Sequence, residues 1–292
     1  MDPEGVAPTV VTEQHRDVTS GGLRLRATEW AAADAPQHTP AVLALPGVLA
    51  PRYSFSRLAH ALAPSFRTIA VDFPGFGESE KPSPARYPYG VSAFSEAITD
   101  LIAGLGLSRA HLLGHGVGGA VALTLAARRP ELVRRLALIA PLAHAPRLQS
   151  TYRSLLAPVI GGLIFRQLLN KSWFTSIYRD KVHDRAKAEE IQRYYQSLNP
   201  PACRAALLAT LRSSLDARSV IADSRRVRAP TLLVWGQDDT LLPLRNGRHL
   251  SREMPQAGLS LLPSGHAPHE ELPEATAATL ARFFSGNRAG TG

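Results

Sequence analysis

The chain of 292 residues has a single cysteine, Cys203. One cysteine excludes an internal disulfide and a cysteine metal cluster, and it agrees with a reducing compartment. No histidine partner for a thiol is visible near Cys203. We therefore expect a small buried or half-buried side chain there and no catalytic thiol.

Long hydrophobic runs are lacking as well, and no secretory leader is expected. No uncharged apolar run reaches the length of about 18 residues that a membrane-spanning helix needs. Residues 1–8 include Asp2 and Glu4 and lack the basic and apolar regions of a secretory signal. A cytoplasmic location is therefore the expectation.

Acidic residues are scarce in one segment. Residues 147–228 hold 15 lysines and arginines against 6 aspartates and glutamates, whereas the rest of the chain holds 18 against 18, so the whole net charge of +9 lies in this segment. Only four of the basic residues are lysines, and the chain is rich in Ala, Arg and Pro, which favours genomic base composition as a plain explanation. No aromatic-interleaved basic motif accompanies the charge, which argues against nucleic acid as a partner.

Short hydrophobic strands alternate with helices over most of the chain, whose hydrophobic content of 45% is enough for a full core. Alternation around Ser20-Gly21-Gly22 predicts a β-hairpin over residues 12–31. Further strands are expected at 41–45, 67–72, 110–113, 133–139, 231–235 and 259–262, and helices at 53–63, 91–106, 117–128, 244–253 and 273–284. This order predicts an α/β fold with a mostly parallel, doubly wound sheet.

The alternation breaks after residue 141, where the chain becomes helical, basic and strand-free up to about residue 227. An insertion between two strands of one sheet explains this better than a second autonomous domain. We expect a core of residues 1–141 and 228–285, an inserted helical cap of residues 142–227 and a disordered tail of residues 286–292.

Five glycine-bearing turns occur in a fixed order. They are Leu45-Pro46-Gly47-Val48, Asp72-Phe73-Pro74-Gly75-Phe76-Gly77-Glu78-Ser79, Gly114-His115-Gly116-Val117-Gly118-Gly119, Trp235-Gly236-Gln237-Asp238-Asp239 and Gly265-His266. Together they resemble the capped α/β-hydrolase fold superfamily over nearly the whole chain. The resemblance implies an oxyanion loop, a loop after the next strand, a nucleophile elbow, an acid turn and a histidine loop. A dinucleotide-binding fold is the weaker alternative, because the third turn departs from G-x-G-x-x-G and follows a late strand.

The chain departs from the family pattern at the elbow, where Gly116 stands in place of a serine, aspartate or cysteine nucleophile. Covalent acyl transfer needs a side chain there, and its loss from a complete triad costs on the order of 10⁶ in kcat, roughly 8 kcal/mol. Neither His115, expected to point into the packing, nor Ser264, set back in the histidine loop, is expected to replace it. Glycine also relieves a backbone strain of about 1–3 kcal/mol at the apex. Pro46 is a second departure, since the family commonly has histidine there.

The rest of the site is nearly complete by the same resemblance. The amides of Val48 and Val117 would form an oxyanion hole, aided by the N-terminus of the helix that starts at Val117. Asp239 fits the acid better than its neighbour Asp238, and His266 fits the base. The plainer alternatives are a turn-capping aspartate and a hydrogen-bonded loop histidine.

Three functional interpretations follow. The first is an enzyme in which a His266/Asp239 dyad acts as general base without a side-chain nucleophile, in slow hydrolysis of an activated ester or lactone or in a proton transfer of the lyase or cyclase type. The second is a non-catalytic protein that binds a small molecule under the cap. The third is an ordinary serine hydrolase that Gly116 has inactivated.

The cap offers the only hint about the ligand. Leu155–Leu169 is largely apolar, and Trp173, Tyr194 and Tyr195 are candidate substrate-binding residues that would add aromatic walls around a small, largely apolar substrate. With the basic charge, an anionic group on the ligand or loose attachment to an acidic membrane is an alternative to ordinary packing with a solvated basic face. No cofactor or metal site is expected, and the oligomeric state stays open.

Overall fold

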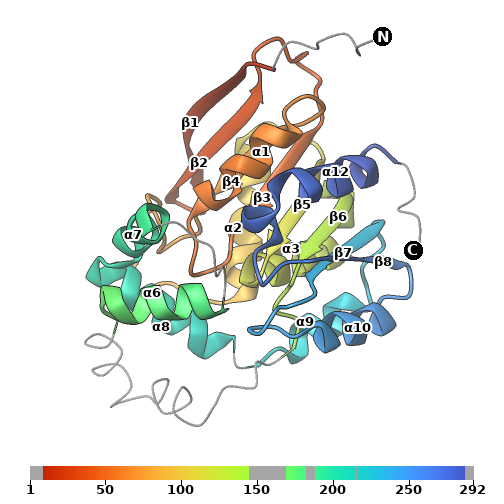
Figure 1. The fold of residues 1–292 in the computed structure, drawn as a ribbon. Helices are drawn as coiled ribbons and strands as arrows, with labels where there is room; N and C mark the ends of the chain where they lie inside the picture. Colours follow the sequence, from red (N-terminus) through yellow and green to blue (C-terminus); the bar gives the residue numbers. More distant parts are fainter. Residues whose placement is uncertain (1–8, 145–168, 182–187, 215, 287–292) are drawn as a thin grey trace.

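The computed structural model of the protein describes residues 9–144, 169–181, 188–214 and 216–286, which form one sheet covered by helices (Figure 1). The sheet has eight strands in the order β1-β2-β4-β3-β5-β6-β7-β8. They are β1 (Val11–Ser20), β2 (Leu23–Ala32), β3 (Ala41–Leu45), β4 (Arg67–Val71), β5 (Ala110–His115), β6 (Val133–Ile139), β7 (Thr231–Gly236) and β8 (Ala257–Leu262). Only the β1–β2 and β2–β4 pairs are antiparallel. The predicted mostly parallel sheet is confirmed.

The first two strands form the predicted hairpin. Ser20 pairs with Leu23, and the two glycines between them have positive φ angles, 53° at Gly21 and 81° at Gly22. A two-residue turn with both central residues in this region matches the right-handed twist of the strands, and glycine enters it without steric cost.

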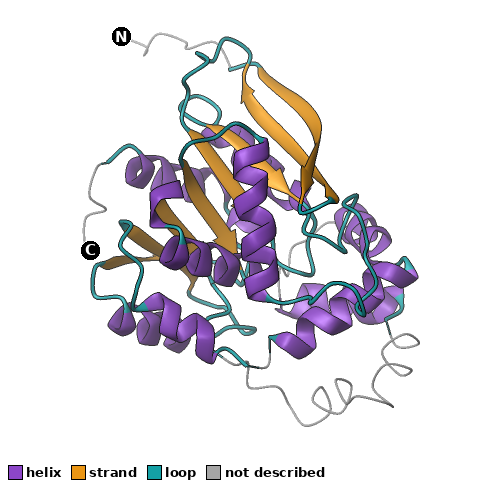
Figure 2. Cartoon of the chain, turned by 180° about the vertical axis from the view of Figure 1, so that it is seen from behind, coloured by secondary structure: helices purple, strands orange, loops and turns teal. Residues whose placement is uncertain are grey.

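Helices cover both faces of the sheet because alternate strand residues point to opposite faces. In β3, Val42 and Ala44 pack in one core cluster, and Leu43 and Leu45 pack in another. The first cluster includes residues of α1 (Ser56–Leu62) and α12 (Pro273–Phe284), and the second includes residues of α2 (Val91–Gly104), α3 (Val117–Arg128) and α10 (Leu244–Glu253). Figure 2 shows the second layer from behind. The short elements are η1 (Arg52–Phe55), η2 (Pro130–Leu132) and α11 (Pro268–Glu271).

Helix α2 ends two residues earlier than the sequence predicts. Gly106 has a φ of 68°, and the amide of Leu107 donates to the carbonyl of Ile102 at 3.0 Å. A glycine in the left-handed region just beyond a helix lets the chain turn back on its last carbonyls. The apolar periodicity runs through this cap, which is why it suggested a longer helix.

The segment between β6 and β7 contains helices and, in its described residues, no strand. These helices are α6 (Lys171–Lys181), α7 (Ala188–Leu198), α8 (Pro201–Ser213) and α9 (Arg218–Ser224). α9 packs against α3 of the core, where Nη2 of Arg128 lies 3.1 Å from Oδ2 of Asp223. The predicted apolar stretch Leu155–Leu169, apart from Leu169, and the tail from residue 287 lie outside the described residues.

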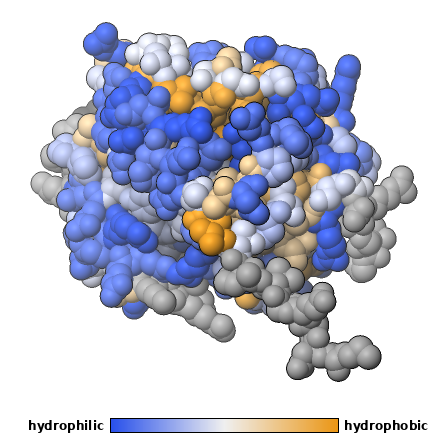
Figure 3. Space-filling model, turned by 90° about the horizontal axis from the view of Figure 1, so that it is seen from above, coloured by the Kyte–Doolittle hydropathy of each residue, from blue (hydrophilic) through white to orange (hydrophobic). Residues whose placement is uncertain are grey.

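The surface seen from above is mostly hydrophilic, and hydrophobic residues occupy smaller areas of it (Figure 3). In the described ranges, no helix combines the length and the hydrophobicity that a membrane crossing requires.

Candidate active site

Gly116 is the apex of a sharp turn between β5 and α3. Its φ of 55° and ψ of −117° lie in a region that is strained for residues with a side chain. The turn is held from both sides, because the Gly116 amide donates to the carbonyl of Ile139 and the Gly116 carbonyl accepts from the amide of Leu142. A Cβ atom on Gly116 would lie 3.8 Å from the Cα atom of Gly47 and 3.8 Å from Nε2 of His266. The apex therefore has room for a side chain that the sequence does not supply.

Gly118 is a second glycine that this turn requires. A Cβ atom there would lie 2.1 Å from the carbonyl oxygen of Leu45, which closes β3. Only a residue without a side chain lets α3 begin this close to the neighbouring strand. The close approach brings the apex next to the loop that follows β3.

Asp239 and His266 come from the turns after β7 and β8 and meet beside the apex. Nδ1 of His266 lies 2.8 Å from Oδ2 of Asp239, and each residue is 5% exposed. The other oxygen of Asp239 accepts hydrogen bonds from the amides of Leu241 at 2.9 Å and Leu242 at 2.8 Å. A carboxylate only accepts, so the His266 proton sits on Nδ1 and leaves the Nε2 lone pair facing the apex.

Two backbone amides complete the surroundings of the apex. Val48 and Val117 line the same cavity as Gly116 and His266. Val117 is the first residue of α3, where an amide has no acceptor within its own helix. Neither amide donates a hydrogen bond to any residue in the described part of the chain. Both amides are therefore without a hydrogen-bond acceptor in the part of the chain that the structure describes, and Val117 stands at the positive end of α3.

The cavity at the apex is small, about 150 Å³, and its described walls are mainly aliphatic. The aliphatic side chains that close it come from the loop after β3, from the start of α3, from the segments after β6 and β7 and from the inserted helix α8. They are Val48, Leu49, Ala50, Val117, Leu142, Leu211, Leu241 and Leu242. Sequence reasoning missed most of these leucines. Leu241 and Leu242 come just after the acid turn, so their place in the sequence indicates that they lie near the site. No local pattern distinguishes Leu211 from an ordinary core residue.

His115 packs against the imidazole of His266 and is one of the residues that line the cavity. Its Nε2–H donates to the backbone carbonyl of His266 at 3.1 Å, and the two ring centroids are 4.6 Å apart. Burial lowers the pKa of His115 well below its usual value, with His269 and His266 adding to the effect, so the ring is neutral. His115 is buried, as expected, and this contact holds the backbone of the histidine loop, although the residue also lines the cavity.

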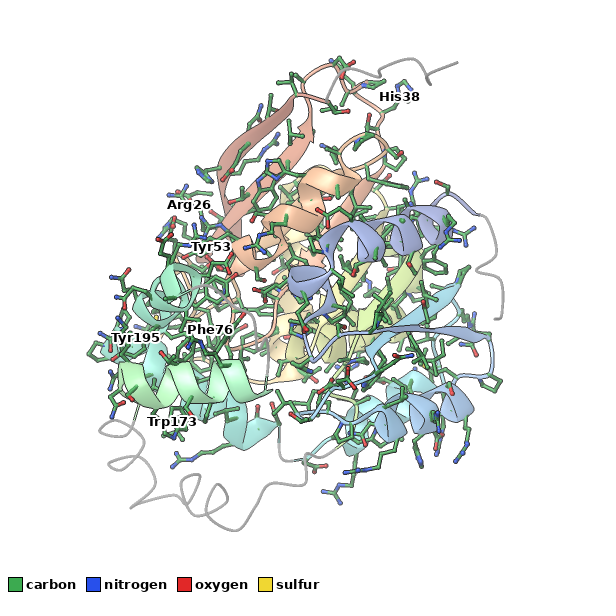
Figure 4. The ribbon with its side chains drawn as sticks, in the orientation of Figure 1. Arg26, His38, Tyr53, Phe76, Trp173 and Tyr195 are labelled. Atoms are coloured by element: carbon green, nitrogen blue, oxygen red, sulfur yellow. The ribbon has the colours of Figure 1, made fainter. Side chains whose placement is uncertain are left out.

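The three predicted aromatic wall residues lie elsewhere. Trp173 is half-buried on α6 and Tyr195 is half-buried on α7, among the inserted helices (Figure 4). The hydroxyl of Tyr195 donates to the Leu169 carbonyl at 3.5 Å, and that of Tyr194 donates to Oε2 of Glu270 at 2.9 Å. The structure does not bring these three side chains to the described walls of the cavity, because the helix faces that carry them pack on other partners.

Glu270 is a buried carboxylate that sequence reasoning did not single out. It belongs to α11, just after the histidine loop, and accepts hydrogen bonds from Tyr194 on α7 and from Tyr178 on α6, the latter at 2.9 Å. Burial raises the pKa of Glu270 to about 7, although both tyrosine hydroxyls and Arg57 oppose the rise. This carboxylate joins the inserted helices to the core. Within the described ranges, no group of three potential metal ligands occurs.

Comparison with known proteins gives consistent matches. Residues 40–273 match the family model for the alpha/beta hydrolase fold. The chain is 31% identical over 258 residues, 86% of its length, to a pimeloyl-[acyl-carrier protein] methyl ester esterase of Neisseria meningitidis serogroup B, and this covers 95% of that protein. It is 26% identical over 251 residues, 82% of its length, to the hydrolase YugF of Bacillus subtilis, of which 87% is covered.

A solved structure repeats the fold. The 2-hydroxy-6-oxo-6-phenylhexa-2,4-dienoate hydrolase of a Rhodococcus species superposes with a TM-score of 0.79 at 23% identity, over 95% of this chain and 100% of that one. The residues that match the family model run from β3 to α11 and include the turns that hold Gly116, Asp239 and His266. This chain belongs to the α/β-hydrolase-fold family.

Proposed function

We propose that the protein is a hydrolase in which His266 activates a water molecule directly, without a covalent enzyme intermediate. One observation carries the proposal: Nε2 of His266 faces an apex with no side chain, while Asp239 holds Nδ1. The space that a nucleophile would fill is then available to water, which finds Nε2 as one polar partner and the amides of Val48 and Val117 nearby.

The reaction balances with these groups alone. The water oxygen attacks the ester carbonyl carbon as Nε2 of His266 takes one water proton. The developing oxyanion accepts hydrogen bonds from the amides of Val48 and Val117. Protonated His266 then gives its proton to the leaving oxygen as the carbon–oxygen bond breaks, which yields an acid and an alcohol. Asp239 stays ionised and stabilises the imidazolium that forms in between.

The other nucleophilic side chains near the site support a direct attack. Ser264 is buried and its hydroxyl lies 3.5 Å from the carbonyl of Gly265, and it does not line the cavity. Cys203 is fully buried on α8, and burial raises the pKa of its thiol. Neither residue stands where an acyl group would meet His266.

The substrate class follows from the cavity and from the relatives. The aliphatic walls and the volume of about 150 Å³ fit a short apolar acyl group. One relative is named a methyl ester esterase and another a hydrolase. An activated ester or thioester with a short acyl chain is therefore the substrate class that we propose.

Turnover of p-nitrophenyl acetate and butyrate tests the proposal. We expect slow steady-state hydrolysis by the unchanged protein, no initial burst, and no acyl adduct in intact mass spectra. His266→Ala should reduce the rate to that of buffer, and Ser264→Ala, a matched control beside the same loop, should keep it. An unchanged protein that is no faster than His266→Ala would overturn the proposal and leave a ligand-binding protein.

A further inference from the structure

A second hollow adjoins the active-site cavity on the other side of the loop after the acid turn. Its volume is about 590 Å³, and we call it the α10 groove. Its walls include His144, Leu241, Leu242 and the basic side chains of α10. Helix α10 lies beside α9 at the edge of the molecule (Figure 1).

The groove concentrates positive charge. Arg245 precedes Arg248 by three residues and His249 by four, and these two precede Arg252 by four and three residues. The four side chains therefore share one face of α10, and all four are exposed. None of the three arginines forms an ion pair with a residue that the structure describes. Like charges at this spacing repel one another, and an anion bound among them would remove that cost.

The neighbouring carboxylate does not neutralise this face. Glu253, at the end of α10, lies 2.6 Å from Nε of Arg225 and 3.6 Å from Nε2 of His249. Its charge is therefore engaged by Arg225 of α9's C-terminal turn, and the three arginines of the groove keep their own charges available.

A histidine adds a second, independent sign of a ligand. Nε2 of His144 is buried and has no hydrogen-bond partner among the described residues. The ring stands edge-on to His249, with centroids 4.7 Å apart and planes at 89°. Burial lowers the pKa of His144, and His249 adds to the effect. A buried, neutral ring nitrogen without a partner costs free energy unless a ligand satisfies it.

One loop, which holds Leu241 and Leu242, lies between the α10 groove and the active-site cavity. Leu241 and Leu242 line both the active-site cavity and the α10 groove. Their amides hold Oδ1 of Asp239, and the carbonyl of Leu242 accepts a hydrogen bond from Nε1 of Trp235 at 2.8 Å. A ligand that crosses this loop touches both hollows at once.

We propose that the α10 groove binds the phosphate-bearing end of an extended ester or thioester whose acyl end enters the cavity at Gly116. Three arginines offer more charge and more donors than one carboxylate requires, and a phosphate dianion with three terminal oxygens matches them. This inference rests on the proposed function, since it names the far end of the same substrate.

A matched substrate pair tests the inference. Butyryl-pantetheine and butyryl-4′-phosphopantetheine differ only in one phosphate, and thiol release measures turnover of both. We expect kcat/KM to be about tenfold higher for the phosphorylated thioester, which corresponds to one charge-assisted contact of about 1.4 kcal/mol. The triple variant Arg245→Gln/Arg248→Gln/Arg252→Gln should bring the ratio to about one.

A control separates local binding from net charge. Arg86→Gln/Arg134→Gln/Arg228→Gln removes the same charge from exposed arginines outside the groove and should keep the preference. Equal kcat/KM values for the two thioesters in the unchanged protein would overturn the inference. A second result would also overturn it. If calorimetry shows that inorganic phosphate binds, that the α10 variant no longer binds it, and that the unchanged protein has no preference between the thioesters, the groove holds a free anion.

Calorimetry also keeps the two proposals apart. If neither thioester is turned over, the proposed function fails, and titration with 4′-phosphopantetheine and pantetheine still decides the groove. Binding of the phosphorylated compound alone, lost in the α10 variant, would uphold the phosphate site. Equal or absent binding of both compounds would overturn it.

Discussion

A Cβ atom on Gly116 would lie 3.8 Å from Nε2 of His266, an ordinary van der Waals distance. The imidazole and the apex are therefore arranged as for a nucleophile and its base, with the nucleophile left out. Because the space is open and the base is oriented, restoring a side chain tests the geometry directly.

Gly116→Ser should install a covalent nucleophile. Its hydroxyl would lie within reach of His266, so we expect a burst of p-nitrophenol equal to the enzyme concentration and an acyl adduct in the mass spectrum. The positive φ of 55° should make the variant less stable by about 1–3 kcal/mol. Gly116→Ala has the same backbone strain without a hydroxyl, and a burst in that variant would contradict the assignment.

Asp239→Asn should lower kcat/KM by about 10²- to 10⁴-fold with little change in KM, because the amide no longer stabilises the imidazolium or holds Nδ1–H. Steady-state kinetics with a short-chain ester measure the effect. Asp238→Asn is the matched control, since Asp238 is exposed and adjacent. Equal losses in the two variants would show that the turn, and not the Asp239 contact, sets the rate.

Glu270→Gln should flatten the dependence of stability on pH. The pKa of Glu270 is about 7 in the folded protein and 4.5 as its ordinary value, so the folded protein holds the proton more tightly than the unfolded chain does. The protonated carboxyl contributes at most about 3 kcal/mol to the free energy of unfolding. This contribution is complete below pH 4.5, decreases as the pH rises and is lost above pH 7.

Urea unfolding at pH 5, 6, 7 and 8 and constant ionic strength measures this dependence. Glutamine keeps an acceptor for Tyr178 and Tyr194 but does not ionise, so its curve should fall less from pH 5 to pH 7. Glu274→Gln, an exposed change on α12, should leave the slope as it is. Parallel curves for Glu270→Gln and the unchanged protein would refute the titration of this carboxylate.

Gly118→Ala should destabilise the fold strongly. Its Cβ would lie 2.1 Å from the Leu45 carbonyl oxygen, so α3 must move away from β3, at a cost on the order of 3 kcal/mol or more. Gly258→Ala meets only a Leu232 methyl group at 3.4 Å and serves as the mild comparison. Thermal unfolding of both variants compares their losses of stability. Equal losses would contradict the close approach of α3 to β3.

Local sequence signals were sufficient for the sheet and for the apex. Apolar runs such as 41–45 and 133–139 can only be buried, and glycine turns after them mark where parallel strands end on one edge of the sheet. The resemblance of those turns to the α/β-hydrolase pattern, in turn, predicts that Gly116, Asp239 and His266 belong to one site. The helix end at Gly106 was missed because periodicity does not report a left-handed cap.

Contacts between segments that lie far apart in the sequence could be assigned only from the tertiary structure. An aromatic residue on an amphipathic helix has the same local pattern whether it faces a ligand or a buried acid, so Tyr194 was assigned to the substrate although its hydroxyl binds Glu270. Likewise, Leu211 reaches the cavity from an inserted helix, and the arginines of α10 enclose a groove with His144 from a different segment. The amino-acid order specifies which faces are apolar or charged, but only three-dimensional packing decides which of those faces meet, because that choice depends on the burial of the whole chain at once.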